Sequence, residues 1–95
     1  MRSRFDAFVR SDATYLLASW HASTRPASID LDDGLTWRRL QIVDVVAGGE
    51  DDDEGVVEFR ASFVGPDGAG LLHERSRFVR EDGVWFYVDG VAGGL

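Results

Sequence analysis

The first hydrophobic positions of the chain recur with helical spacing. Phe5 and Phe8 stand three residues apart, which predicts a short helix over residues 3–10. Ser3 and Asp6 have the spacing of a capping box, so we expect their side chains to cap the start of this helix.

A second helix is predicted after a break. Either Ser11 or Asp12 can cap its start. Its broad apolar stripe is formed by Tyr15, Leu16 and residues 18–20. It ends before Arg25, because a residue that precedes proline is disfavoured in the helical region. The polar segment 26–35 is predicted to be a loop that contacts the core through Ile29, Leu31 and Leu35.

From Trp37 onward the pattern becomes extended. Runs rich in β-branched and aromatic residues predict four strands, at 37–46, 56–64, 71–81 and 84–89. The first strand can carry a bulge at Arg38-Arg39. The segments between the strands have turn compositions: the acidic tract 48–55, the glycine-rich tract 65–70, and Asp82-Gly83, which is typical of a type I′ hairpin.

Alternation along the strands sorts the predicted sheet into two faces. The tight last turn pairs Phe78 with Tyr87, and pairing Val64 with Leu71 across the glycine-rich turn would set Glu58 opposite Arg77. One face is then mainly apolar and must be covered by the helices, with Phe59, Phe78 and Trp85 at its centre: Val57, Phe59, Ala61, Phe63, Leu72, Glu74, Ser76, Phe78, Trp85 and Tyr87. The other face carries Glu58, Arg60, Ser62, His73, Arg75, Arg77, Val79, Val84, Phe86 and Val88.

Length and composition narrow the possible classes of protein. Ninety-five residues form one domain, 1–95, and the absence of cysteine removes disulfides and thiolate chemistry. A net charge of −7 argues against nucleic-acid binding. No apolar run is long enough to span a membrane. We therefore expect an acidic cytoplasmic domain of the α+β class, in which N-terminal helices cover an antiparallel sheet of about four strands.

A family resemblance runs through most of the chain, in Met1-Arg2-Ser3-Arg4-Phe5, Ala7-Phe8, Tyr15-Leu16, Trp20-His21, Trp37, Leu40, Ile42, Val57-Glu58-Phe59, Leu72-His73-Glu74, Ser76, Phe78, Gly83, Trp85, Tyr87 and Gly90. In this order the segments resemble the YchJ-like family of uncharacterised bacterial proteins. The resemblance implies a curved cone like that of nuclear transport factor 2. Members of the family usually carry a Cys-rich SEC-C zinc-binding segment ahead of this domain. This chain has no cysteine, so zinc binding is not carried over, and the chain is either a stand-alone protein or an excised domain.

Two polar residues stand at the centre of the predicted apolar face. Glu74 would be desolvated there, and its pKa raised, so it could act as an acid, a base or a ligand anchor beside Ser76. Alternatively, Glu74 pairs with a helix arginine such as Arg4, or caps helical N–H groups. Tyr87 and Trp85 lie on the same face as core aromatics, and the Tyr87 hydroxyl is available to a ligand.

Trp20 and His21 close the second helix and complete the candidate pocket of Trp20, His21, Glu74, Ser76 and Tyr87. His21 either caps the last carbonyls of the helix or faces Glu74 as a proton-transfer pair. His73 falls on the opposite face, so a shared metal site is not expected, and no cofactor is assigned. The acidic tract is read as a solvated turn, since it lacks the ligand spacing of a calcium loop.

These features predict a non-catalytic module that binds a small molecule or a protein. The alternative is a small lyase, isomerase or hydrolase that uses Glu74 and His21. Because two short helices can cover only one sheet face, we also expect a homodimer, or docking of a further N-terminal segment, through a patch of Val79, Val84, Phe86 and Val88.

Overall fold

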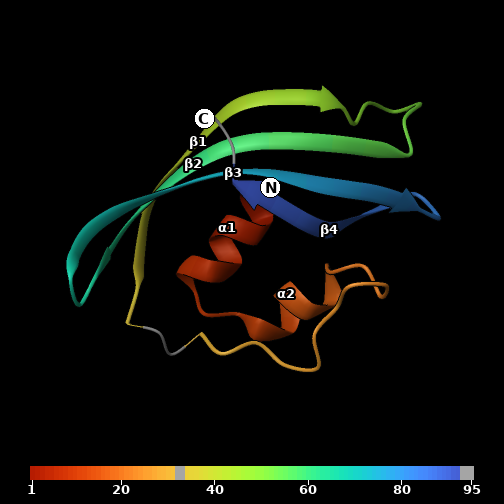
Figure 1. Cartoon of the computed structure of the whole chain (residues 1–95). Coiled ribbons are helices and arrows are strands. Elements are labelled where there is room, and N and C mark those ends of the chain that lie inside the picture. The colour runs from red at the N-terminus through yellow and green to blue at the C-terminus, as the bar shows by residue number, and fades with distance from the viewer. Residues whose placement is uncertain (32–33, 93–95) are drawn as a thin grey trace.

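A computed structural model describes residues 1–31 and 34–92. Its helices are α1 (Arg2–Val9) and α2 (Ala13–Ala18), and its strands are β1 (Thr36–Ala47), β2 (Glu54–Gly65), β3 (Gly68–Glu81) and β4 (Val84–Ala92). The strands form one antiparallel sheet in the order β1-β2-β3-β4. The sheet arches over both helices, so that one face is concave and covered, and the other is convex (Figure 1). The predicted α+β architecture is confirmed.

The starts of the two helices are capped differently from each other. Asp12 caps α2, and its Oδ1 accepts a hydrogen bond from Tyr15 N at 3.1 Å. No side chain caps α1, which begins after Met1. The predicted capping box is therefore wrong: Ser3 lies inside the helix, and its Oγ accepts a hydrogen bond from the Tyr15 hydroxyl at 2.7 Å.

The turn between β2 and β3 is shorter than the glycine-rich tract predicted. Gly65 pairs with Gly68, so only two residues form the turn, and Val64 faces Ala69 rather than Leu71. Glycines enter the strands where neighbouring side chains need their space: a side chain at Gly70 would overlap the Phe63 ring. The predicted register is thus wrong by two residues.

A slip of two residues changes partners but keeps every side chain on its face, because the side-chain period is two. Glu58 lies opposite Arg75 instead of Arg77. Arg77 lies opposite Asp89, beyond a bulge in the β3–β4 ladder. The division of the sheet into an apolar concave face and a charged convex face is retained.

Two other local predictions are confirmed. Asp82 and Gly83 both have positive φ angles, of 53° and 79°, as a type I′ turn requires. A register shift between Trp37 and Arg39 marks a bulge at the predicted place in β1, and a second shift lies between Ile42 and Asp44.

The core lies between the concave face and the helices. Its buried apolar residues are Ala7, Leu16, Phe59, Ala61 and Phe78. Trp37 closes one side through ring contacts with Phe5, Phe8 and Phe63. Trp85, which was expected at the core centre, is only half-buried. None of the described helices is long and apolar enough to cross a membrane.

Candidate functional site

The chain that leaves α2 is fastened to β4 by backbone hydrogen bonds. Tyr87 N donates to Ser19 O at 2.9 Å, and His21 N donates to Tyr87 O at 2.7 Å. Trp20 and Tyr87 form a parallel bridge, and their ring centroids are 5.0 Å apart. The helix therefore ends at Ala18, before the Trp20-His21 pair that was expected to close it, and two aromatic rings are held over the concave face.

Arg4 is buried between α1, α2 and these rings, with 4 % of its surface exposed. Its Nη1 donates to Leu16 O at 3.1 Å and to Ser19 Oγ at 2.7 Å. The guanidinium carbon lies 4.3 Å from the Tyr87 ring centroid and 5.3 Å from that of Trp20, which are cation–π distances. Burial lowers the pKa of Arg4, although Tyr87, Tyr15 and Glu74 oppose that effect.

Arg4 thus holds its charge with neutral partners. Among the described residues, no carboxylate oxygen lies within 4.0 Å of an Arg4 nitrogen, which is the limit for an ion pair. A buried cation without a paired anion is unfavourable unless something else compensates it. Arg4 is therefore a buried positive charge, between the helices and the concave face, that has no paired carboxylate.

Glu74, on β3, lines the same small cavity as Arg4. Its Oε2 accepts a hydrogen bond from the buried Ser76 hydroxyl at 3.0 Å. The carboxyl group fills the space above Gly90, where any side chain would overlap it. Glu74 neither forms an ion pair with Arg4 nor caps a helix, so neither structural alternative describes its contacts.

The Tyr87 hydroxyl is held in its neutral form. Burial raises the pKa of Tyr87 above its ordinary value, the charge of Glu74 raises it further, and Arg4 opposes the shift. Among the described residues no acceptor receives a hydrogen bond from this hydroxyl. It remains a donor that can serve a bound molecule.

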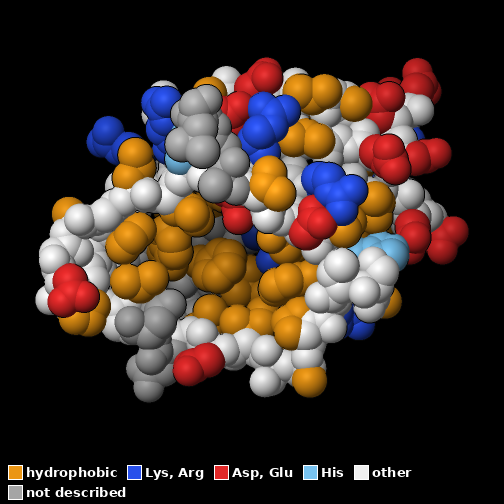
Figure 2. All heavy atoms as spheres, in the orientation of Figure 1, with side chains coloured by type: hydrophobic (Ala, Val, Ile, Leu, Met, Phe, Trp, Pro, Cys, Tyr) orange, Lys and Arg blue, Asp and Glu red, His pale blue; other side chains and the backbone are white. Residues whose placement is uncertain are grey.

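Two cavities flank Arg4. The larger has a volume of about 260 Å³ and lies towards Phe78 and Trp85. The smaller, of about 170 Å³, lies towards Trp37 and Glu74. Both are lined by Met1, Arg4 and Tyr87. We call the two cavities together the hollow; Figure 2 shows the depression between helices and sheet, lined by hydrophobic side chains.

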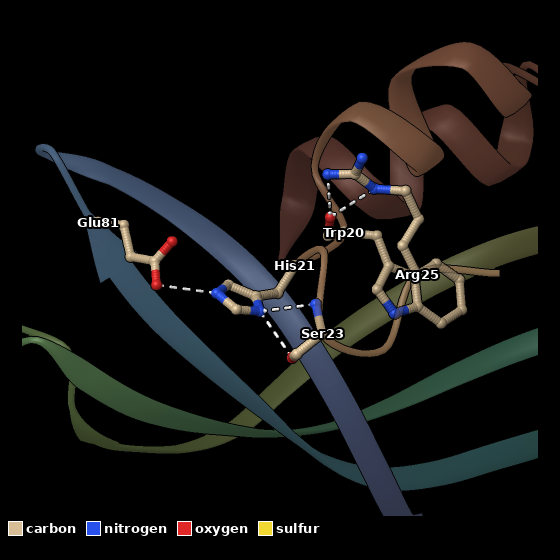
Figure 3. A network of polar contacts seen from close by, with 5 residues as sticks. All are labelled: Trp20, His21, Ser23, Arg25 and Glu81. Carbon is tan, nitrogen blue, oxygen red and sulfur yellow. Dashed lines mark hydrogen bonds and ion pairs between the residues drawn. The ribbon is translucent and has the colours of Figure 1, made fainter.

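The His21 ring points towards Glu81, at the end of β3 (Figure 3). Its Nε2 lies 2.9 Å from Glu81 Oε2, and its Nδ1 accepts a hydrogen bond from Ser23 N at 3.1 Å. Since Nδ1 is an acceptor, the neutral ring carries its proton on Nε2 and donates it to Glu81. His21 therefore neither caps α2 nor faces Glu74, and it lines neither cavity.

Residues 20–25 form a strap along the edge of β4. The Thr24 hydroxyl donates to Val88 O at 2.6 Å. The Arg25 guanidinium donates twice to Trp20 O, at 3.0 and 2.9 Å (Figure 3). The His21 ring lies 6.1 Å from the Phe86 ring. The patch expected to mediate a dimer is thus partly covered, and of its four residues only Val84 is exposed.

The convex face is a charge network. Glu58 lies 2.7 Å from both His73 and Arg75, and Arg77 forms a bidentate pair with Asp89. The hydrogen bond from His73 holds the pKa of Glu58 below its usual value, and Arg77 does the same for Asp89. Arg75 and Arg77 are therefore both engaged in charge pairs. Within residues 1–31 and 34–92, no group of three or more acidic or histidine side chains could hold a metal ion.

The structure brings together four of the five candidate residues. Trp20, Glu74, Ser76 and Tyr87 line the smaller cavity, and His21 does not. The residue that sequence reasoning undervalued is Arg4, considered only as a partner for Glu74. The signal was present, since Arg4 stands at i before Ala7 and Phe8, in phase with the apolar stripe of α1.

Comparison with known proteins places this geometry in a family. Residues 1–90 match the model of the YchJ middle NTF2-like domain. The chain is 54 % identical over 90 residues to a UPF0225 protein of Streptomyces coelicolor, covering 95 % of this chain and 69 % of that one. A UPF0225 protein of Streptomyces avermitilis is 50 % identical, with 95 % and 61 % covered. The chain therefore spans only part of these relatives.

Two solved structures share the fold. A SEC-C motif containing protein from Rhodopseudomonas palustris is similar with a TM-score of 0.84 and 27 % identity, covering 99 % of this chain and 76 % of that one. A second such protein, from Psychrobacter arcticus, has a TM-score of 0.74 at 24 % identity, covering 100 % and 59 %. None of these names states an activity.

Proposed function

Because the chain belongs to the family of YchJ middle NTF2-like domains, we propose that it is a non-catalytic module that takes up a small molecule in the hollow between its helices and sheet. The observation that carries the proposal is the pair of cavities that the buried Arg4 lines. A binding pocket is typically a concave, mostly apolar space with a few convergent polar groups. The hollow has this composition.

The energetics of a small domain support the same conclusion. A chain of this length buries a modest share of its surface, so unfilled space and an unpaired buried cation both reduce its stability. Departures from good packing are expected where function compensates for them. Arg4 and the cavities beside it are such a departure.

The structure does not bring His21 to Glu74, as the catalytic alternative requires. A proton-transfer mechanism with Glu74 and His21 needs both groups within reach of one bound atom. His21 is instead bonded to Glu81 and Ser23 outside the hollow. We therefore do not propose a lyase, isomerase or hydrolase activity.

The proposal is tested with a library of small neutral, cationic and anionic compounds, followed in ¹H–¹⁵N correlation spectra. Binding in the hollow should move the signals of lining residues, among them Ser3, Ser19 and the Trp85 indole. If no compound binds, or if every hit moves only signals of the convex face, the proposal is wrong.

A pair of variants with equal added bulk serves as the control. Val57→Phe places a ring into the larger cavity and should abolish binding of the hits that move the signals of that cavity. Val91→Phe adds the same bulk at a position that is 63 % exposed, paired with Arg75 on β3, and should leave binding unchanged. Both variants should remain folded, as their amide spectra will show.

A further inference from the structure

We infer that the ligand of the hollow is an organic anion, with its charge at Arg4 and its apolar body in the larger cavity against Phe78 and Trp85. This inference rests on the proposed function and names the chemical class of the bound molecule. It is carried by the distribution of charge around the larger cavity and by the unused donors of Arg4.

The larger cavity has a positive side chain and no negative one in its wall. Among the described residues that line it, Arg4 carries the only charged side chain, and the remainder are Met1, Ser3, Tyr15, Ser19, Val45, Gly48, Gly55, Val56, Val57, Phe78, Trp85 and Tyr87. In a site of reduced dielectric constant a cation that has no paired carboxylate attracts an anion strongly. The wall therefore selects against cationic ligands.

Arg4 retains hydrogen-bonding capacity. A guanidinium has five N–H donors in a planar fork that matches a carboxylate or phosphate. The hydrogen bonds to Leu16 and Ser19 come from Nη1 alone. No described residue accepts a hydrogen bond from Nε or Nη2. The Tyr87 and Trp20 rings fix the position of the fork, so little entropy is lost when an anion binds.

Glu74 determines the side from which an anion can approach. Its carboxylate borders the smaller cavity and is absent from the wall of the larger one. An anion in the smaller cavity would meet repulsion from Glu74, whereas one in the larger cavity reaches Arg4 with no carboxylate in the wall. The charge pattern therefore assigns the anion to the larger cavity.

The rest of the larger cavity suits a ligand with both polar and apolar parts. The hydroxyl groups of Ser3 and Tyr87 border it and can donate to anionic oxygens. Those of Tyr15 and Ser19 border it as well, but they already donate, to Ser3 Oγ and to Tyr15 O. Phe78 and Trp85 form an aromatic wall, which favours a flat apolar body. A carboxylic acid with one ring combines the two requirements.

The test compares three probes of similar shape and different charge: phenylacetate, phenylacetamide and 2-phenylethylammonium. Titrated into the wild-type chain, phenylacetate should bind at least tenfold more tightly than the amide, and the ammonium should not bind measurably. Equal or tighter binding of the amide or the ammonium overturns the anion class and leaves the proposed function standing. If none of the probes and no library compound binds, both fail.

Variants of Arg4 give the second readout. Arg4→Met should weaken phenylacetate binding at least tenfold and leave the amide unaffected, whereas Arg4→Lys should lie between Met and wild type. Arg60→Met, at an exposed position on the convex face, is the matched control and should bind as wild type. If Arg4→Met keeps the phenylacetate affinity, the inference is wrong. If Arg4→Met does not fold, the probe series on the wild type decides alone.

Discussion

The carboxyl group of Glu74 occupies the space that a side chain at Gly90 would need. Position 90 is thus a glycine for reasons of packing, since the backbone of β4 must pass close beneath a polar side chain of β3. This contact keeps Glu74 beside Ser76, to whose hydroxyl it is bonded. Both Glu74 and Ser76 line the smaller cavity.

Gly90→Ala should therefore displace the Glu74 carboxyl and destabilise the domain. In a Glu74→Ala background the same change should be neutral or stabilising, because alanine in a strand loses less entropy on folding than glycine. We expect a coupling free energy of at least about 1 kcal/mol between the two changes, as for other contacting residues. It is measured by urea unfolding of the wild type, both single variants and the double variant.

The control for this cycle pairs Gly90→Ala with Arg60→Ala on the convex face. These two effects should add to within about 0.5 kcal/mol, as independent sites do. Additivity in the Glu74 cycle as well would mean that the carboxyl does not lie over Gly90.

Tyr87 predicts how stability changes at alkaline pH. Its pKa is raised above 10.0 mainly by burial, so the folded state binds this proton more tightly than the unfolded state does. The stabilising contribution is complete below the unfolded-state pKa and is lost as the pH rises through the folded-state value. The free energy of unfolding should fall above about pH 10, and the fall should be smaller in Tyr87→Phe.

Glu74 also contributes to this shift. Glu74→Gln should lower the pKa of Tyr87, though not to its ordinary value, because burial is the larger cause. In a Tyr15→Phe background Tyr87 is the sole tyrosine, and its ionisation can be followed by ultraviolet absorbance. An unchanged or higher pKa in Glu74→Gln would contradict the described proximity.

Phe59 and Trp85 should differ in their importance for stability. Phe59 is 2 % exposed, so Phe59→Ala should cost about 3–5 kcal/mol. That is much of the roughly 5–10 kcal/mol that holds such a domain together. Trp85 is half-buried beside the larger cavity, so Trp85→Ala should cost only about 1–2 kcal/mol. Urea midpoints give the order of the two losses. A larger loss of stability in Trp85→Ala than in Phe59→Ala would contradict the half-buried position of Trp85 beside the larger cavity.

At acidic pH the convex face should control stability. The pKa of Glu58 is held below 4.5, first by its hydrogen bond from His73. Its contribution is present above the unfolded-state pKa and is lost as the pH falls through the folded-state value. Glu58→Gln should flatten the acid limb of the stability profile, and His73→Ala should flatten it more than Arg75→Ala. The reverse order would place Arg75 as the main partner.

The fold could be predicted from sequence because its signals are local or periodic. Strand alternation gave the correct faces even though the β2–β3 register was wrong by two residues. The register itself depended on which glycines form the turn, and Gly70 enters the strand because the Phe63 ring covers it. That contact between strands leaves no mark in the local sequence pattern.

Local and periodic signals also predicted part of the candidate site. Glu74, Ser76 and Tyr87 follow from strand alternation alone. The position of His21 depends on where α2 ends, and the bridge from Trp20 to Tyr87 ends it early. Once the chain joins the edge of β4, His21 meets Glu81 instead of Glu74. The partner of His21 is therefore set by tertiary contacts, which the local sequence pattern does not reveal.

The most direct test of the central claim, that Arg4 presents free donors to an open cavity, is the Nε–H signal of Arg4 in ¹H–¹⁵N spectra. All ten cationic side chains are arginines, and the signal that disappears in Arg4→Lys identifies this one. The account predicts that saturation with phenylacetate moves the Arg4 signal and leaves those of the other arginines in place. An Arg4 signal that stays unmoved at saturation, or equal movement of all ten, would contradict it.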